Sequence, residues 1–359
     1  MQKSLLFIPD ISGYTKFIQS TEIEHAEHVI AEILEVLIAA NTEELKLAEI
    51  EGDALFFYKE GSIPSQERLL AQVEGMFSAF YGHLKMMEKN RICTCNACAT
   101  APNLELKIVA HTGAIQFLKV QGNKKPFGSS VITVHRLLKN SVNSNNYVLL
   151  SKDLSNSVDM KPTYQSDLFG FKEAKEEYDD VMVDYIYSNI DVEQLQITPF
   201  EKPFKVNFKK VPDAIFDMEF NTSANELLEI ITNYKYRGSW VKGVDSFVFN
   251  ENEVTRLGTE HTCIVNGKQL DFVTVIKDCQ PNEIIYGELT KSPPPVDELY
   301  NFFIITPINE TSCRMKVEIY AVSKSPFKKL LFLFVKGVLK KSTANSLENL
   351  KTLVNSKKK

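Results

Sequence analysis

Hydrophobic residues in the first half of the chain follow two spacings: the short apolar runs of buried strands and the three-to-four-residue repeat of amphipathic helices. Strands are predicted at 4–10, 45–60 (a hairpin turning at residues 51–53), 104–120 (two strands bent at Gly113), 147–151 and 180–187. Helices are predicted at 20–41, 66–89 and 129–142, the first behind a Ser-Thr pair with a glutamate in its first turn. One sheet with helices packed on it, an α+β or α/β sandwich, accounts for this order.

The second half has a different pattern. A helix-like piece is predicted at 223–240, strands at 244–250, 253–265, 270–279, 283–289, 299–308 and 312–322, and a long helix at 326–354. An antiparallel sheet between a short and a long helix predicts an α+β fold curled around an interior. Polar residues and two prolines interrupt the pattern at 191–204. We therefore expect two domains, 1–195 and 205–359.

Length and composition narrow the class of protein. The chain has 359 residues, 44% hydrophobic and 24% charged, which suits two soluble globular domains. A net charge of −5 argues against a nucleic-acid binder, because neutralising phosphates requires a basic face. No apolar stretch approaches the roughly 18–20 residues that span a bilayer, and the N-terminus lacks a signal-peptide pattern. We expect a cytoplasmic protein.

Two carboxylates occupy comparable positions in the first half. Asp10 ends the first strand, and Asp53 lies in the turn of the following hairpin. If these strands are neighbours, both side chains point into one patch, and oxygen ligands from two turns suit Mg²⁺ or Mn²⁺. The backbone N–H groups of the adjoining turn, residues 11–15, could hold phosphates at a helix start. Turn aspartates are common, so the spacing by itself favours an ordinary structural role.

Four motifs in order resemble class III adenylyl and guanylyl cyclases: "FIPDISGYTKF", "EIEGDALFFY", "KIVAHTGAI" and "FGSSVITVHRLL". The resemblance covers about residues 4–190 and implies a ferredoxin-like domain that pairs head to tail in a homodimer. In that family two metal ions activate the ribose hydroxyl of a nucleoside triphosphate, which attacks the α-phosphorus and expels pyrophosphate. The implied ligands are Asp10, Asp53 and the Ile11 carbonyl for Mg²⁺ or Mn²⁺, Ser12, Gly13, Tyr14 and Thr15 for the phosphates, and Arg136 for the triphosphate during catalysis.

The chain departs from the family pattern at several of these positions. Glu49 stands at the position that selects the base in the family, where glutamate is typical of guanylyl cyclases. The second base-selecting position carries Lys125, which fits neither the adenylyl nor the guanylyl pattern. The asparagine that orients the ribose is replaced by Ile132, which donates no hydrogen bond. Lys172 and Lys175 both lie where the family has a late lysine. Losing one transition-state donor costs on the order of 10²- to 10³-fold in rate.

Three interpretations of the first domain therefore stay open. One is a degenerate cyclase that binds a nucleoside triphosphate with Mg²⁺ or Mn²⁺ and cyclises it weakly or not at all. The second is a working cyclase with altered residues. The third is a non-enzymatic nucleotide sensor or dimerisation scaffold.

The segment "RICTCNACAT" places Cys93, Cys95 and Cys98 on a predicted loop. Three neighbouring thiolates suit Zn²⁺, and a closed site needs a fourth ligand, either His83 or a thiolate of a second chain. The alternative is three reduced cysteines on a cytosolic loop. His25 is expected on a solvated helix face among glutamates.

The second half resembles the START-like, or polyketide-cyclase-like, helix-grip family in its capped helix leading to Trp240, its string of strands and its long final helix. The resemblance implies an apolar cavity for a hydrophobic small molecule or lipid, coupled to the first domain. A packed domain without ligand is the alternative. The segment "KKLLFLFVKGVLKK", residues 328–341, is apolar with basic ends and could lie on a membrane. We expect its apolar residues to cover the sheet instead, so membrane contact is not predicted.

Overall fold

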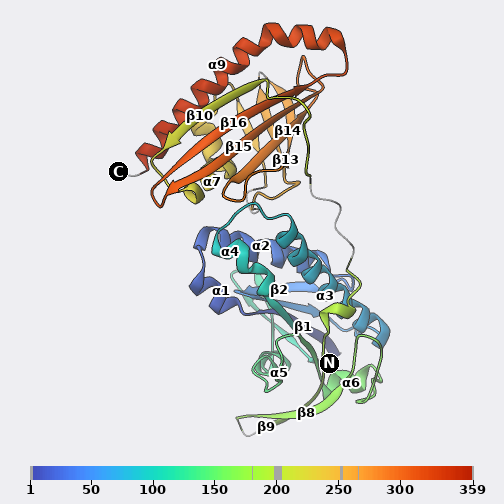
Figure 1. Cartoon of the computed structure of the whole chain (residues 1–359). Coiled ribbons are helices and arrows are strands. Elements are labelled where there is room, and N and C mark those ends of the chain that lie inside the picture. Colours follow the sequence, from blue (N-terminus) through green and yellow to red (C-terminus); the bar gives the residue numbers. More distant parts are fainter. Residues whose placement is uncertain (1–2, 180, 198–203, 251–253, 266, 358–359) are drawn as a thin grey trace. The chain divides into compact units, whose positions relative to one another are not determined.

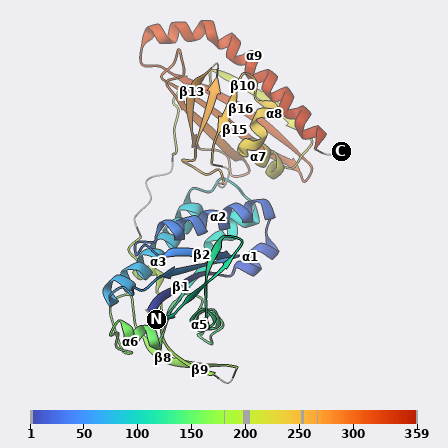
Figure 2. The same cartoon turned by 180° about the vertical axis from the view of Figure 1, so that it is seen from behind.

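The computed structural model describes residues 3–179, 181–197, 204–250, 254–265 and 267–357 (Figures 1 and 2). The chain divides into two compact units, the first made of Met1–Met86 and Thr100–Pro199 and the second of Met87–Ala99 and Phe200–Lys359. The predicted domain boundary near residue 200 lies outside the described residues.

The first unit is built on a seven-stranded mixed sheet of order β2-β3-β1-β4-β7-β9-β8, in which β4 and β7 are parallel and the other neighbours antiparallel. Its strands are β1 Lys3–Ser12, β2 Lys46–Glu51, β3 Ala54–Lys59, β4 Glu105–Ala114, β7 Tyr147–Ser151, β8 Lys172–Tyr178 and β9 Val181–Asn189. A separate hairpin is formed by β5 Gln116–Val120 and β6 Asn123–Phe127. The antiparallel core β4-β1-β3-β2, with helices linking β1 to β2 and β3 to β4, confirms the predicted ferredoxin-like topology.

Helices cover both faces of this sheet. They are α1 Tyr14–Ser20, α2 Ile23–Ala39, α3 Gln66–Lys89, α5 Ser129–Leu137 and α6 Lys152–Ser157, with 3₁₀ turns at Ala101–Asn103 and Val192–Gln194. The short helix α4 Asn96–Thr100 belongs, except for Thr100, to the second unit. Leu6 and Ile8 of β1 pack in one cluster with Val134 and Leu137 of α5. The alternating β1 residues face the opposite side, where Figure 1 shows α2 and α3.

The second unit contains a seven-stranded, wholly antiparallel sheet of order β10-β16-β15-β14-β13-β12-β11. Its strands are β10 Ala214–Phe220, β11 Ser246–Val248, β12 Glu260–Val265, β13 Lys268–Val275, β14 Ile284–Lys291, β15 Glu298–Asn309 and β16 Ser312–Val322. Its helices are α7 Ala224–Thr232, α8 Arg237–Trp240 and α9 Pro326–Ser356, with a 3₁₀ turn at Tyr234–Tyr236. The predicted α+β class is confirmed in both units.

One face of the second sheet carries the main core of this unit. Leu227 and Ile231 of α7 and Leu350 and Val354 of α9 join the same buried cluster as strand residues such as Val317. Ser223 caps α7 through a capping box with Glu226, as expected for its sequence. Within the described residues, no helix is long and apolar enough to cross a membrane.

The differences from the predicted elements are local. The cysteine segment is not a loop throughout, because α4 begins at Asn96 and includes Cys98. The predicted helix 223–240 breaks into α7, a 3₁₀ turn and α8. The strands β6, β8 and β10 were not predicted. Residue 180 of the predicted strand 180–187, and residue 253 of the predicted strand 253–265, lie outside the described residues.

Candidate functional sites

The sheet of the first unit brings Asp10 and Asp53 together. Asp10 of β1 lies opposite Ala54 of β3, and the backbone N–H of Ile11 donates to the carbonyl of Asp53 at 3.0 Å. Asp53 therefore occupies the turn directly beside the end of β1. This is the neighbouring arrangement that the strand, helix and hairpin order predicts.

The carboxylates of Asp10 and Asp53 carry more negative charge than the neighbouring Lys107 can neutralise. Burial raises the pKa of Asp10, and the neighbouring charge of Asp53 raises it further. Burial likewise raises the pKa of Asp53. Lys107 of β4, whose Nζ lies 3.4 Å from a carboxylate oxygen of Asp10, opposes both shifts. One lysine beside two carboxylates leaves net negative charge, which a divalent cation with oxygen ligands would neutralise.

The turn after β1 is shaped by Gly13, whose φ of 89° lies in the left-handed region that favours glycine. The hydroxyl of Ser12 donates to the carbonyl of Asn145 at 3.2 Å, so this side chain is already engaged within the unit. Tyr14 and Thr15 open α1, which has seven residues. The predicted contacts of residues 12–15 with phosphates stay a prediction.

The remaining site residues of the first unit form separate pairs. Glu49 of β2 and Lys125 of β6 make an ion pair at 2.7 Å, which joins the two predicted base-selecting positions. Arg136 of α5 pairs with Asp179. Ile132, one turn earlier on α5, is 55% exposed, so it fills no cavity within its own unit.

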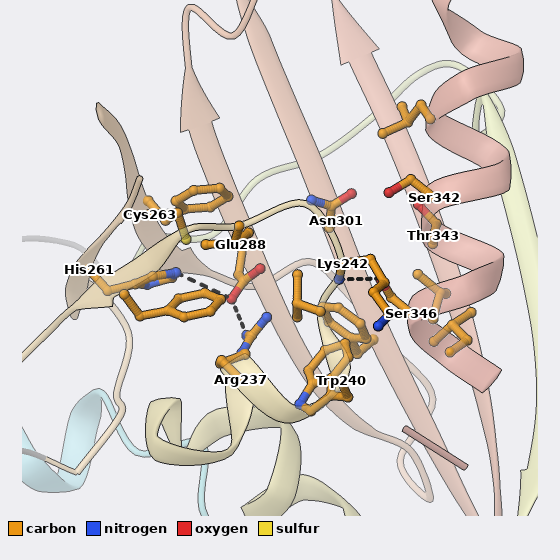
Figure 3. A pocket seen from close by; sticks show the side chains of 18 residues that line it. Arg237, Trp240, Lys242, His261, Cys263, Glu288, Asn301, Ser342, Thr343 and Ser346 are labelled. Carbon is orange, nitrogen blue, oxygen red and sulfur yellow. Dashed lines mark hydrogen bonds and ion pairs between the residues drawn. The ribbon is translucent and has the colours of Figure 1, made fainter. Parts of the chain in front are cut away.

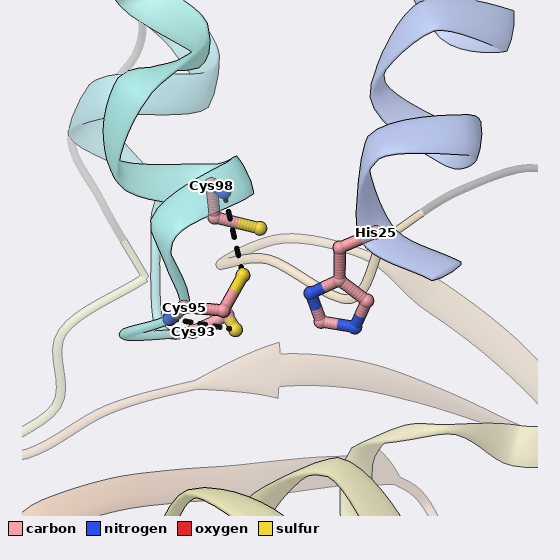
Figure 4. A group of neighbouring side chains, drawn as sticks. All are labelled: His25, Cys93, Cys95 and Cys98. Atoms are coloured by element: carbon pink, nitrogen blue, oxygen red, sulfur yellow. Dashed lines mark hydrogen bonds between the residues drawn. The ribbon is translucent and has the colours of Figure 1, made fainter. Parts of the chain in front are cut away.

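The three predicted cysteine ligands converge. The backbone N–H of Cys95 donates to the sulfur of Cys93, and that of Cys98 to the sulfur of Cys95, both at 3.4 Å (Figure 4). Hydrogen bonds with the other two sulfurs raise the pKa of the buried Cys98 thiol. Three crowded sulfurs, two of which accept backbone N–H groups, are suited to a bound cation, which would replace the thiol protons.

The fourth member of this group is His25. One ligand atom from each of Cys93, Cys95, Cys98 and His25 lies within 4.8 Å of the others, and Figure 4 shows these four side chains. The expectation that His25 lies on a merely solvated face is therefore wrong. His83, named as a fourth ligand, instead pairs with Glu32, with its Nε2 3.1 Å from the carboxylate. A Cys₃His set is a recognised donor set for structural zinc, and here it makes a candidate metal site.

The second unit has a partly open cavity of about 160 Å³ between the sheet, α8 and α9 (Figure 3). Apolar and aromatic side chains such as Trp240, Phe272 and Phe303 make up part of its wall. Arg237, Glu288 and His261 also line it, although the sequence patterns did not single them out. The cavity is about as large as one that holds a benzene molecule.

A buried charge network crosses this cavity wall. The Arg237 guanidinium pairs with Glu288 and donates to the hydroxyl of Tyr286 at 3.0 Å. The Tyr286 hydroxyl donates to Glu288 at 2.5 Å. Burial opposes ionisation of Glu288, but Arg237 and these hydrogen bonds outweigh it and lower the pKa of the carboxyl. Burial lowers the pKa of His261 to about 4, so its imidazole is neutral at pH 7.

Three nitrogens on residues that line this cavity lack a hydrogen-bond partner among the described residues, although the atoms themselves are covered by protein. They are Nε of Arg237, Nε1 of Trp240 and Nδ1 of His261, all on buried side chains. Unsatisfied buried polar atoms are uncommon in folded proteins and call for a partner. Two of the three, on Arg237 and Trp240, are donors, so the missing partner is an acceptor.

Comparison with solved structures yields nucleotidyl cyclase domains over the first half. The catalytic core of a rhodopsin–guanylyl cyclase with converted specificity aligns at 13% identity over 53% of this chain and 96% of its own, with a TM-score of 0.40. The guanylate cyclase domain of RhGC from Catenaria anguillulae aligns at 14% identity over 53% and 97%, with a TM-score of 0.40. The adenylyl cyclase CyaB from P. aeruginosa aligns at 15% identity over 53% and 94%, with a TM-score of 0.38. At these values no activity is transferred.

Comparison of the sequence with family models and with curated proteins gives a match of each kind. A family model described as a protein of unknown function, DUF2652, matches residues 30–147. The uncharacterized protein Rv2561/Rv2562 of Mycobacterium tuberculosis is 34% identical over 130 residues, which cover 36% of this chain and 60% of that protein. The chain thus spans 60% of the length of this curated relative.

Proposed function

We propose that the first unit binds a nucleoside triphosphate together with Mg²⁺ or Mn²⁺ at Asp10 and Asp53. The observation that carries this is the convergence of two carboxylates of raised pKa at the end of β1, with Lys107 beside them. The order of the four cyclase-like motifs supports a nucleotide as the ligand. A bound divalent ion would supply positive charge to the phosphates and lower the pKa of the ribose hydroxyl.

The chemistry open to such a site is cyclisation. The ribose oxygen would bond to the α-phosphorus, the bond from that phosphorus to the bridging oxygen would break, and pyrophosphate and a proton would leave. Asp10 and Asp53 would hold the charge that this step needs, and Arg136 would steady the triphosphate. Ile132 offers no hydrogen bond to the ribose, so we propose weak turnover at most. A nucleotide-sensing or dimerisation scaffold is the outcome if turnover is absent.

Incubation with Mn²⁺ and each nucleoside triphosphate, followed by mass spectrometry, tests this proposal. We expect nucleotide binding in the wild type, a small yield of cyclic product, and loss of both in Asp10→Asn. The matched control is Asp167→Asn, an exposed aspartate of the same unit. Binding without product supports the scaffold. Absence of nucleotide binding with metal present, or equal behaviour of the two variants, rejects the assignment.

We also propose that the Cys₃His group holds Zn²⁺. Elemental analysis of the purified protein is expected to show about one zinc per chain, falling strongly in Cys95→Ser and His25→Ala. Cys279→Ser is the matched control, because this exposed cysteine lies outside the group. His83→Ala tests the ligand that the sequence analysis named. Absence of zinc above background rejects the site, and loss in His83→Ala but not in His25→Ala reassigns its fourth ligand.

We propose a second function for the cavity of the second unit, on the observation of its apolar and aromatic lining. The cavity would bind a small apolar molecule of about one ring. Trp240 is the only tryptophan of the chain, so its fluorescence reports binding directly. We expect toluene to shift this emission. Thr343→Phe, which fills the cavity, should abolish the response; an unchanged response would reject this site.

A further inference from the structure

The long helix α9 has two halves with opposite surroundings. In its C-terminal half, Leu347, Leu350 and Val354 are buried in the core of the second unit. In its N-terminal half, five large apolar side chains are more than half exposed. They are Phe327 (68%), Leu330 (54%), Leu333 (64%), Phe334 (77%) and Val338 (69%). The expectation that the apolar residues of 328–341 cover the sheet is therefore wrong for most of this segment.

These exposed side chains share one side of the helix. Phe327, Leu330, Phe334 and Val338 follow the i, i+3, i+7, i+11 spacing of a continuous apolar face. The residues that attach this half to its own unit are different ones. Phe332 packs with Val296 and Ala321, and Leu339 joins the same small cluster. The apolar face thus points away from the sheet, and we call it the α9 face.

The charge of this segment is opposite in sign to that of the whole chain. Residues 319–347 contain six lysines and no aspartate or glutamate, in a chain of net charge −5. Lys329, Lys336 and Lys340 follow an i, i+7, i+11 spacing, and each stands two residues from a member of the α9 face, which places them on the opposite side of the helix. Basic residues on the polar side of a helix whose other side is exposed and apolar are the pattern of a helix that lies in the interface of an anionic bilayer.

We infer that the α9 face docks on a lipid bilayer that carries anionic headgroups. The apolar side chains enter the boundary between headgroups and acyl chains, and the lysines contact the anionic groups. A second copy of the chain is a poorer occupant on charge grounds. In a two-fold symmetric contact two segments with six lysines each and no aspartate or glutamate would approach one another, and like charges would repel.

The position of the cavity agrees with this docking surface. Leu339, Ser342 and Thr343, which line the 160 Å³ cavity, follow the exposed segment on the same helix. A bilayer under the α9 face would therefore lie on the far side of the helix that forms one wall of the cavity. Membrane binding itself needs neither the cavity ligand nor the nucleotide, so its test is independent of both.

Vesicle sedimentation of the full chain tests this inference. We expect binding to phosphatidylcholine vesicles that contain phosphatidylserine, weak binding to pure phosphatidylcholine, and a decrease as NaCl rises from about 0.05 M to about 0.5 M. The double variant Phe334→Glu, Val338→Glu should lower the partition coefficient on anionic vesicles about tenfold or more. Replacing Lys329, Lys336 and Lys340 by glutamine should remove most of the salt dependence.

Val211→Glu is the matched control, because Val211 is an 82% exposed apolar residue of the same unit. It should bind vesicles like the wild type, and unchanged thermal unfolding of every variant should show that folding is preserved. Failure of the wild type to bind anionic vesicles, or an equal loss in Val211→Glu, overturns the inference. It is also overturned if light scattering shows a dimer that Phe334→Glu, Val338→Glu dissociates while no vesicle binding occurs.

Discussion

Each unit has a buried or partly buried carboxyl group, and the surroundings shift the pKa of the two groups in opposite directions. In the first unit, burial and the repulsion between Asp10 and Asp53 raise the pKa of Asp10, although Lys107 opposes this shift. In the second, the pKa of Glu288 is lowered, because Arg237 and Tyr286 outweigh the cost of its burial. The two sites differ in how much positive charge their own side chains place beside the carboxylates. The second unit compensates its carboxylate from its own side chains, whereas the first leaves a deficit that an external cation can fill.

The largest expected effect comes from breaking the compensated pair. Glu288→Gln leaves the buried Arg237 without its counter-charge, so the free energy of unfolding of the second unit should fall by about 3–5 kcal/mol. Urea unfolding followed by Trp240 fluorescence measures it. Glu310→Gln, at an exposed position of the same unit, should change stability by less than about 0.5 kcal/mol. Equal effects of the two substitutions would contradict the compensated site.

The pH dependence of the second unit sharpens the comparison. Folded His261 has a pKa of about 4, lowered from 6.5 by burial, so the unfolded chain binds the extra proton between these values. The stability of the second unit should therefore fall as pH drops from about 6.5 to about 4. His261→Gln should flatten this part of the profile. An unchanged slope in the variant would assign the dependence to other groups.

In the absence of metal, the site of Asp10 and Asp53 should show the opposite pH dependence of stability. Because the pKa of Asp10 is raised, its ionised form opposes folding at neutral pH, and protonation as pH falls relieves this cost. Asp10→Asn should therefore raise the thermal stability of the metal-free protein. Mn²⁺ should stabilise the wild type and not the variant. A strongly destabilised, metal-free Asp10→Asn would indicate a structural role for this carboxylate.

The smallest effect on stability is expected at the exposed ion pair of Glu49 and Lys125. Lys125→Ala should alter the free energy of unfolding by less than about 0.5 kcal/mol, because solvent screens an exposed pair. If these positions select the base, the ratio of GTP to ATP affinity should nevertheless change. An unchanged ratio would remove both residues from the proposed nucleotide site.

Local patterns predicted the scaffold of the first site, since Asp10 and Asp53 sit at a strand end and a hairpin turn that short stretches of sequence define. Contacts between distant segments were not accessible in this way. The ion pair of Lys125 with Glu49 depends on the placement of β6 near β2. The sequence around His25, which is rich in glutamate, gave no sign that this histidine lies near the three cysteines.

The second unit shows the same limit. Whether Glu288 points inward depends on the register of β14 with its neighbours, which a single strand does not encode. The apolar residues of α9 predicted a helix that covers the sheet, but they occur on more than one side, and only the folded unit shows which side is buried. The sequence showed an apolar segment with basic ends at residues 328–341. This pattern did not decide whether the segment contacts the sheet or a membrane.

The central claim is that Asp10 and Asp53 bind a divalent cation together with a nucleotide, and calorimetric titration of GTP and ATP into the protein with Mn²⁺ tests it most directly. The account predicts saturable, Mn²⁺-dependent binding in the wild type and in Asp167→Asn, and loss of at least about tenfold in affinity in Asp10→Asn and Asp53→Asn. Affinity should also weaken as pH is lowered, because protons compete with the cation for carboxylates of raised pKa. Absence of binding in the wild type, or binding that neither aspartate substitution weakens, would contradict it.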